Sequence, residues 1–218
     1  METFIHPVIR FLAGHAKAAL RKDSSGHGWD HALRVHRNAL QIASGYPEAN
    51  TLVIEAAALM HDVIDRKVAQ DPAEALVCVK DWAETAGMSP DDIRHMTHIM
   101  QGLSFKGEST VDVMSTLEGK IVQDADRLDA IGAIGIARAF TFGGRHERPL
   151  YDPDSPPLRN MNPSEYFSHK SHTINHFHEK LLLLKDRMMT PEGKKMAQDR
   201  HAFMELYLNQ FLKEWHGL

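Results

Sequence analysis

A short apolar stretch that ends in a histidine–aspartate pair most constrains how this chain folds. Residues 56–60 read Ala-Ala-Ala-Leu-Met and are followed directly by His61 and Asp62. Such a run is typical of a helix inside a protein, so it carries the two polar residues inward, where they need partners. A neutral imidazole nitrogen and a carboxylate are ligands that suit a divalent transition metal. The alternative is a helix end at which His61 and Asp62 meet solvent.

Apolar residues recur at helical spacing along the chain, and no segment shows sustained period-two alternation, so we predict an all-α fold. Asn50, Asp71 and Ser89 are expected to cap the starts of helices. The expected helices cover about 4–20, 29–44, 51–61, 72–87, 90–101, 117–142, 164–189 and 191–215.

The composition excludes several classes of protein. The 218 residues carry a net charge of −4, so no basic field favours nucleic-acid binding. The single cysteine, Cys78, rules out an intrachain disulfide and fits a reducing compartment. The first ten residues lack the apolar core of a signal peptide, and no run reaches the roughly 20 apolar residues of a membrane span. We therefore expect a cytoplasmic protein with no membrane partner.

Two further helices carry polar groups at positions that should face inward. In the first, His27 and His31 lie four residues apart on one face, and Arg34 follows one turn after His31. The other helix carries Asp124 and Asp126 within an otherwise apolar sequence. With His61 and Asp62, these residues would supply imidazole and carboxylate groups from three separate helices.

The segment that follows the aspartates is almost free of polar side chains. Residues 130–137 read Ala-Ile-Gly-Ala-Ile-Gly-Ile-Ala, and we expect a fully buried helix there. Gly132 and Gly135 each cost about 1 kcal/mol relative to alanine inside a helix. We interpret both glycines as packing residues that let another helix approach closely.

The order of these motifs resembles the HD-domain metal-dependent phosphohydrolases, and more narrowly their small stand-alone bacterial members. The matching segments are H-x-x-x-H-x-x-R-V at 27–35, L-M-H-D-x-x-D at 59–65 and Q-D-A-D-R-L-D-A-I-G-A-I-G-I-A-R at 123–138. The resemblance covers most of the chain and implies one HD domain, an all-α bundle with a long loop near 145–163. Its metal-binding core would span about 23–142 and its C-terminal helices about 164–216.

The resemblance also implies a ligand set for one divalent metal ion: His31, His61, Asp62 and Asp126. Two imidazoles and two carboxylates would leave positions on a six-coordinate ion for water and a phosphate oxygen. Asp126 is preferred to Asp124 because it precedes Arg-Leu, where similar families keep the fourth ligand. Mn, Mg, Fe, Co, Ni and Zn all stay open as the metal.

Other residues receive catalytic or substrate-binding roles from the same resemblance. Asp65 would orient or deprotonate the attacking water, and Arg34 and Lys67 would bind phosphate oxygens. For Asp65 the alternative is a surface acid, and for Lys67 a solvated lysine.

Three more residues are candidates for substrate binding: His27, His98 and Lys106. His27 has the alternative role of a structural histidine, and His98 that of a solvated one.

A histidine-rich segment lies near the C-terminus. His169, His172, His176 and His178 include a pair at i and i+4, which makes a second metal conceivable. No carboxylate pattern accompanies them, so we favour polar histidines on the surface of a helix.

The function predicted from the resemblance is hydrolysis of nucleotide phosphates, with nucleoside-triphosphate pyrophosphohydrolysis as the preferred reaction. A 5′-nucleotidase or a phosphodiesterase is the nearest alternative, and a non-catalytic sensor of metal or nucleotide is the alternative of another class. The partner would be a small nucleotide, with no nucleic acid, and the oligomeric state is open. We expect the polar loop 145–163, which contains Arg145, Arg148 and Arg159, to lie beside the metal and help hold substrate. The alternative is an exposed insertion with its arginines in water.

Overall fold

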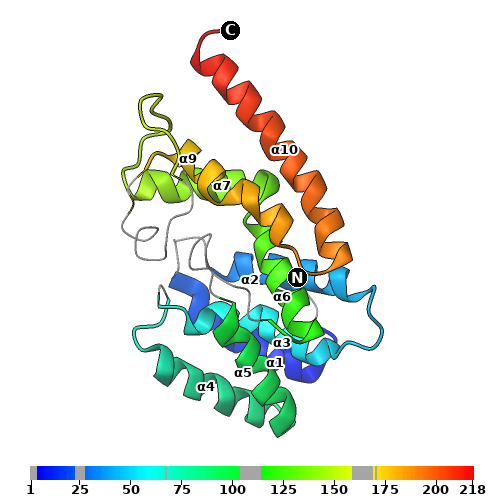
Figure 1. Ribbon diagram of the computed structural model, residues 1–218. Coiled ribbons are helices and arrows are strands. Elements are labelled where there is room, and N and C mark those ends of the chain that lie inside the picture. The colour runs from blue at the N-terminus through cyan, green and yellow to red at the C-terminus, as the bar shows by residue number, and fades with distance from the viewer. Residues whose placement is uncertain (1–3, 23–27, 67, 104–113, 159–168, 170) are drawn as a thin grey trace. The chain divides into compact units, whose positions relative to one another are not determined.

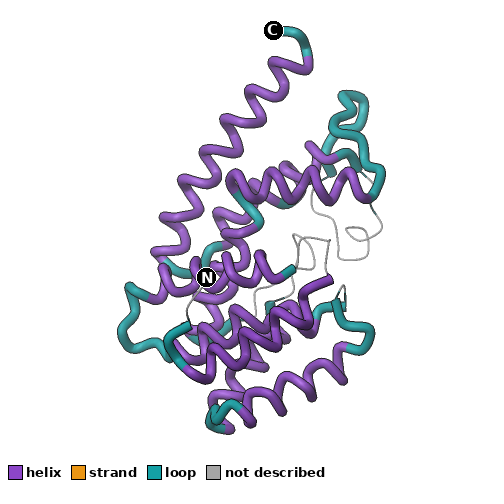
Figure 2. Tube along the Cα trace, turned by 180° about the vertical axis from the view of Figure 1, so that it is seen from behind, coloured by secondary structure: helices purple, strands orange, loops and turns teal. Residues whose placement is uncertain are grey.

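The computed structural model describes residues 4–22, 28–66, 68–103, 114–158, 169 and 171–218. Within these residues it contains helices and loops but no strand, as Figure 2 shows, so the all-α prediction is confirmed. The chain divides into two compact units, one holding the described residues up to Asp126 and the other those from Arg127 onward. The prediction of a single domain stays a prediction.

The first unit is built around α3, which is buried from Val53 to its end apart from Glu55. Helices α1, α2 and α5 pack against α3, whose three successive alanines leave room for close neighbours. The elements of this unit (Figure 1) are α1 (Pro7–Ala19), η1 (Leu20–Lys22), α2 (Trp29–Ala43), α3 (Thr51–Met60), η2 (His61–Ile64), α4 (Pro72–Thr85), α5 (Pro90–Gly102) and α6 (Leu117–Asp129). The last three residues of α6 belong to the second unit.

The three predicted N-caps are confirmed. The side chain of Asn50 accepts a hydrogen bond from the backbone N–H of Val53 at 3.3 Å. Asp71 and Ser89 cap α4 and α5 in the same way, and each precedes a proline at the first helical position. Capping satisfies N–H groups that have no partner inside the helix, so these short polar signals fix where the helices begin.

The long helix expected over 117–142 is wrong, because the structure breaks it into α6 and α7 (Gly132–Arg145). Ile131 is extended and Gly132 has a φ of +74°, a conformation that glycine adopts without the steric cost of a Cβ. A Cβ on Gly132 would also lie 3.0 Å from the Cβ of Arg200. Gly132 therefore serves a turn between two helices and is not in a helix interior.

The expectation that residues 130–137 are fully buried is also wrong. Ile134 is 43% exposed, and Ala133 and Ala137 are exposed as well. Helix α7 packs against α9 and α10 within the second unit and turns Gly135 and Ile136 inward. The apolar residues on its other face, Ala133, Ile134 and Ala137, are exposed.

The second unit consists of α7, α9 (Thr173–Glu179), η3 (Leu181–Arg187) and α10 (Pro191–Trp215). The helix predicted over 164–189 is wrong within the described residues, since Lys180 leaves helical geometry and separates α9 from a 3₁₀ segment. Leu181 and Leu184 are both buried, and their spacing of three matches the three residues per turn of a 3₁₀ helix. Residues 164–168 lie outside the described part of the chain.

No helix among the described residues is both long and apolar enough to cross a membrane.

Candidate metal centre

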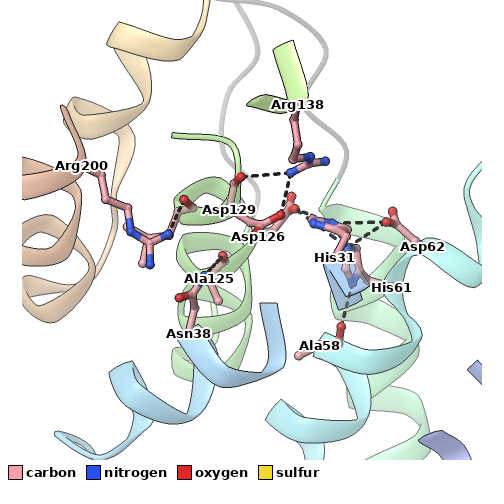
Figure 3. A network of polar contacts seen from close by, with 11 residues as sticks. His31, Asn38, Ala58, His61, Asp62, Ala125, Asp126, Asp129, Arg138 and Arg200 are labelled. Carbon is pink, nitrogen blue, oxygen red and sulfur yellow. Dashed lines mark hydrogen bonds and ion pairs between the residues drawn. The ribbon is translucent and has the colours of Figure 1, made fainter. Parts of the chain in front are cut away.

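Three elements of the first unit bring two histidines and two aspartates together. His31 lies in the first turn of α2, His61 and Asp62 stand where α3 tightens into η2, and Asp126 lies near the end of α6. Figure 3 shows the two imidazoles and the two carboxylates pointing toward one another. Since α3 ends abruptly in its polar pair, burial of its alanines and leucine places that pair in the interior.

The facing atoms of this cluster are closely spaced. His31 Nε2 is 3.2 Å from His61 Nε2, 3.3 Å from Asp62 Oδ2 and 3.4 Å from Asp126 Oδ1. His61 Nε2 is 3.4 Å from Asp62 Oδ2 and 3.9 Å from Asp126 Oδ1. His31, His61 and Asp62 form the tight group that can hold a metal ion, and Asp126 approaches both histidines beside it.

A backbone contact sets the tautomer of His61. Its Nδ1 lies 2.9 Å from the carbonyl oxygen of Ala58, which can only accept a hydrogen bond. Nδ1 must therefore carry the proton, and Nε2 then presents a lone pair to the cluster. Metal-binding histidines commonly have one ring nitrogen fixed by a carbonyl or carboxylate in this way.

The burial of the cluster leaves a carboxylate oxygen without a donor. His31, His61 and Asp62 are 2%, 6% and 5% exposed, and Asp62 Oδ2 has no hydrogen-bond partner among the described residues. A buried carboxylate oxygen is costly unless it is paired or coordinates a metal. A cation bound between the imidazole lone pair and the carboxylates would remove that cost.

The spacing of the four donor atoms fits a common cation. Ligand atoms about 2.1 Å from one ion lie roughly 3.0 Å apart as octahedral neighbours and roughly 3.4 Å apart in a tetrahedron. The measured separations of 3.2–3.9 Å include the tetrahedral value and begin slightly above the octahedral one. The donor set of two nitrogens and two oxygens also suits first-row divalent metals. The residues present therefore fit the predicted ion.

The three aspartates of α6 have different surroundings. Asp126 is the one whose carboxylate reaches both histidines, and its side chain is 33% exposed. Asp124 is fully buried and Asp129 is 1% exposed. Oδ2 of Asp129 accepts a hydrogen bond from Arg138 at 2.8 Å in the second unit. The carboxylate of Asp126 thus lies close to the two histidines, and its role as the fourth ligand stays a prediction.

Asp65 is half-buried and follows η2, three residues after Asp62. Its backbone is held from both sides, since its N–H donates to the carbonyl of Asp62 and its own carbonyl accepts from Val68 and Ala69. Arg34 is half-buried on α2, one turn from His31. The catalytic roles of Asp65 and Arg34 stay predictions.

The roles of the remaining predicted site residues are not decided by the described part of the chain. His98 is exposed on α5, and its role in binding substrate stays a prediction. His27, Lys67 and Lys106 lie outside the described residues.

Sequence reasoning overlooked Asn38, which is buried on α2 two turns after His31. Its Nδ2 donates to the carbonyl of Ala125 at 3.2 Å, directly before Asp126 in the chain. The signal was present in the sequence, because an asparagine stands among Val35, Ala39 and Ile42 on a face that is otherwise apolar. A buried amide of this kind needs a partner.

The histidine-rich segment does not form a solvated helix surface, so that interpretation is wrong. His172 is 2% exposed and caps α9, with Nδ1 accepting from the N–H of Asn175 at 3.1 Å. Nε2 of His172 must then carry the proton, and it donates to the carbonyl of Ser155 at 3.1 Å. Nε2 of His169 lies 3.2 Å from Oε1 of the buried Glu179. These contacts attach the preceding loop to α9.

The described part of the predicted loop follows α7 and ends at residue 158. The carbonyls of Pro149 and Leu150 accept hydrogen bonds from the N–H groups of Thr173 and Ile174. Arg148 lies over the ring of Phe142, with its guanidinium carbon 5.3 Å from the ring centroid. The described part of the loop is therefore held by contacts within its own unit, and the predicted place of the loop beside the metal stays a prediction.

Comparison with known proteins identifies the family. The family model described as "HD domain" matches residues 28–131, the segment that holds all four converging residues. A solved structure from Lactobacillus plantarum is 36% identical, covers 99% of this chain and 100% of its own, and superposes with a TM-score of 0.84. An HD-superfamily hydrolase from Bacillus thuringiensis is 40% identical, covers 96% of this chain and 97% of its own, and superposes with a TM-score of 0.76.

A third relative is YpgQ of Bacillus subtilis (strain 168), which is 37% identical over 204 residues, or 93% of this chain and 91% of YpgQ. A crystal structure of YpgQ in complex with ADP superposes with a TM-score of 0.73, covering 93% of this chain and 97% of that one. The chain belongs to the HD-domain family of metal-dependent phosphohydrolases.

Proposed function

We propose that this protein hydrolyses nucleoside triphosphates to nucleoside monophosphate and pyrophosphate, using one divalent ion held by His31, His61, Asp62 and Asp126. The observation that supports the ion most directly is the buried Asp62 Oδ2, which has no hydrogen-bond donor in the described part of the chain and faces both histidine Nε2 atoms. When bound, the ion supplies Lewis-acid polarisation of a phosphoryl oxygen and acidifies a water molecule.

The protein's own residues divide the remaining tasks in this proposal. Asp65 accepts the proton of the attacking water, since it follows the ligand pair closely and has its backbone fixed on both sides. Arg34, one turn from His31, and Lys67 neutralise charge on the phosphates. His27, His98 and Lys106 contact the rest of the nucleotide.

A nucleotide substrate is supported by the relative that has been crystallised with ADP. ADP contains the adenosine and the first two phosphates of a nucleoside triphosphate. A site that binds ADP therefore has residues that contact the nucleoside and residues that contact the phosphates. The same ligand is compatible with a 5′-nucleotidase, which is our second candidate. The two reactions differ in which phosphorus is attacked and therefore in the product released.

A panel of nucleotides tests the proposal. The protein is freed of metal with a chelator, reloaded separately with Mn²⁺, Mg²⁺ or Co²⁺, and incubated with nucleoside tri-, di- and monophosphates. We expect pyrophosphate and the monophosphate from triphosphates, and no turnover with chelator present. Orthophosphate released from monophosphates would overturn the proposal in favour of the nucleotidase. No release from any nucleotide in the panel would overturn nucleotide hydrolysis itself.

A further inference from the structure

The four converging residues are not held in place in the same way. His31, His61 and Asp62 are almost completely buried, and α2 and α3, which carry or lead into them, pack against each other. The side chain of Asp126 is 33% exposed and comes from α6, far along the chain. Packing around its side chain therefore restrains Asp126 less than the other three, and its position depends more on the helix that carries it.

Asn38 supplies a specific tie to that helix. It lies seven residues after His31 on α2, and seven residues bring a helix back to within about 20° of the same direction. The face of α2 that presents His31 to Asp126 thus also presents Asn38 to the carbonyl of Ala125. Two turns of one helix contact two consecutive residues of another, as Figure 3 shows.

The contact is buried and directional. Asn38 is 8% exposed and Ala125 is fully buried, so water does not compete freely for the amide. A hydrogen bond to a backbone carbonyl fixes the helix itself, whatever rotamer the neighbouring side chain adopts. A shift or rotation of α6 that moved Asp126 away from His31 would have to stretch or break this bond.

We propose that Asn38 is a positioning residue of the metal centre, setting the distance of the Asp126 carboxylate from the two imidazoles through the Ala125 carbonyl. This inference rests on the proposed metal site and adds to it a residue that touches neither ion nor substrate. Partners in the shell around metal ligands typically change affinity by 10–100-fold when they are lost. We expect Asn38 to act within that range.

The test compares Asn38→Leu, which keeps the shape but removes the donor, with Asn38→Gln, which keeps an amide. The dissociation constants for Mn²⁺ and Co²⁺ are measured by titration, and the melting temperature is measured without metal. Asn38→Leu should bind both ions about 10–100-fold more weakly. Asn38→Gln should recover part of that affinity. The melting temperatures of both variants without metal should stay close to that of wild type. Ala125 lies inside α6, so its carbonyl can still accept a hydrogen bond within the helix.

Asn175 offers a matched control in the second unit. It is 2% exposed and its Nδ2 donates to the backbone carbonyl of Ser155 at 2.8 Å, so it makes the same kind of bond away from the metal ligands. Asn175→Leu should lower the melting temperature and leave the affinity for both ions unchanged. An equal loss of affinity in both leucine variants would show a general effect of destabilisation and overturn the role of Asn38.

The remaining outcomes separate this inference from the proposed function. Unchanged metal affinity in a folded Asn38→Leu protein overturns the inference and leaves the hydrolase intact. A wild-type protein that binds the ions but releases no pyrophosphate overturns the proposed reaction, while weaker binding by Asn38→Leu still supports the inference. A wild-type protein that binds neither ion overturns both. If Asn38→Leu fails to fold, wild-type affinity in Asn38→Ser, whose shorter side chain cannot span to Ala125, overturns the inference.

Discussion

His61 in the first unit and His172 in the second are buried to similar degrees, yet they serve opposite purposes. Nδ1 of His61 donates to the carbonyl of Ala58, which leaves a lone pair on Nε2 facing His31 and two carboxylates. Nδ1 of His172 accepts from the N–H of Asn175, so its Nε2 carries a proton and donates to Ser155. The backbone group beside one ring nitrogen decides whether the other can bind a metal.

The carboxylates nearby repeat the contrast. Asp62 Oδ2 is buried without a hydrogen-bond partner among the described residues. Glu179 is also buried, but its Oε1 is 3.1 Å from the N–H of Leu158 and 3.2 Å from His169. Histidine content is high in both regions, so the number of histidines does not identify a metal site. The feature that distinguishes the first region is a lone pair on His61 Nε2 that faces a buried carboxylate oxygen without a hydrogen-bond partner among the described residues.

The largest expected effect comes from removing the convergent groups. His61→Ala and Asp62→Ala should each lose the metal, because the three donors that remain in each variant cannot replace the buried ligand that is removed. Turnover should fall to the level of chelator-treated wild type. Metal content after gel filtration and nucleotide hydrolysis measure this. His172→Ala and Glu179→Ala are the matched controls, and loss of metal in either would break the comparison.

Replacing a group beside the cluster should slow the reaction while the metal remains. Asp65→Asn keeps the size of the side chain but removes the proton acceptor, so turnover should fall by roughly 10²–10⁴-fold. Metal content and the melting temperature with metal bound should match wild type. Turnover within a factor of about two of wild type would leave Asp65 as a partly buried acid without a catalytic role.

Removing the second-unit histidine should cost stability alone. His172→Ala deletes the cap of α9 and the bond to Ser155, which together should destabilise folding by about 2 kcal/mol. Chemical denaturation of the metal-free protein measures the change. His172→Asn can still cap the helix, so it should recover part of the loss. A full return of stability would assign the whole effect to the cap.

Per pH unit, the smallest expected effect concerns acid sensitivity. Burial, with Lys180 and then Arg148 adding repulsion, lowers the pKa of His176 from 6.5 to about 3. The unfolded chain then binds a proton that the folded chain does not, so stability present above pH 6.5 is lost as the pH falls toward 3. The slope from one such group is at most about 1.4 kcal/mol per pH unit.

His176→Gln does not titrate, so its stability should depend less steeply on pH between 6.5 and 3 than that of wild type. Both proteins are measured with chelator present, which removes any contribution from metal binding. Parallel curves for the two proteins would show that His176 is protonated in the folded state as easily as in the unfolded chain.

Local sequence signals accounted for much of the fold. Asn50, Asp71 and Ser89 cap helices where they were expected to, because capping involves only neighbouring backbone groups. The break at Gly132 was missed, because the apolar pattern continues across it without a change of period. The open face of α7 was missed for a related reason: an apolar pattern does not say how many neighbours a helix has.

The sequence by itself determined the all-α class, and the resemblance of its motifs to the HD-domain phosphohydrolases brought His31, His61, Asp62 and Asp126 forward as one set. The tertiary structure alone decided what their atoms can do. The tautomer of His61 depends on the Ala58 carbonyl. The place of Asp126 depends on the hydrogen bond from Asn38 to the carbonyl of Ala125, which lies 87 residues after Asn38. The tertiary structure also brought the carbonyl of Ser155 within hydrogen-bond distance of His172. Hydrogen bonds depend on distances between atoms, and spacing along a chain does not fix those distances until the helices pack.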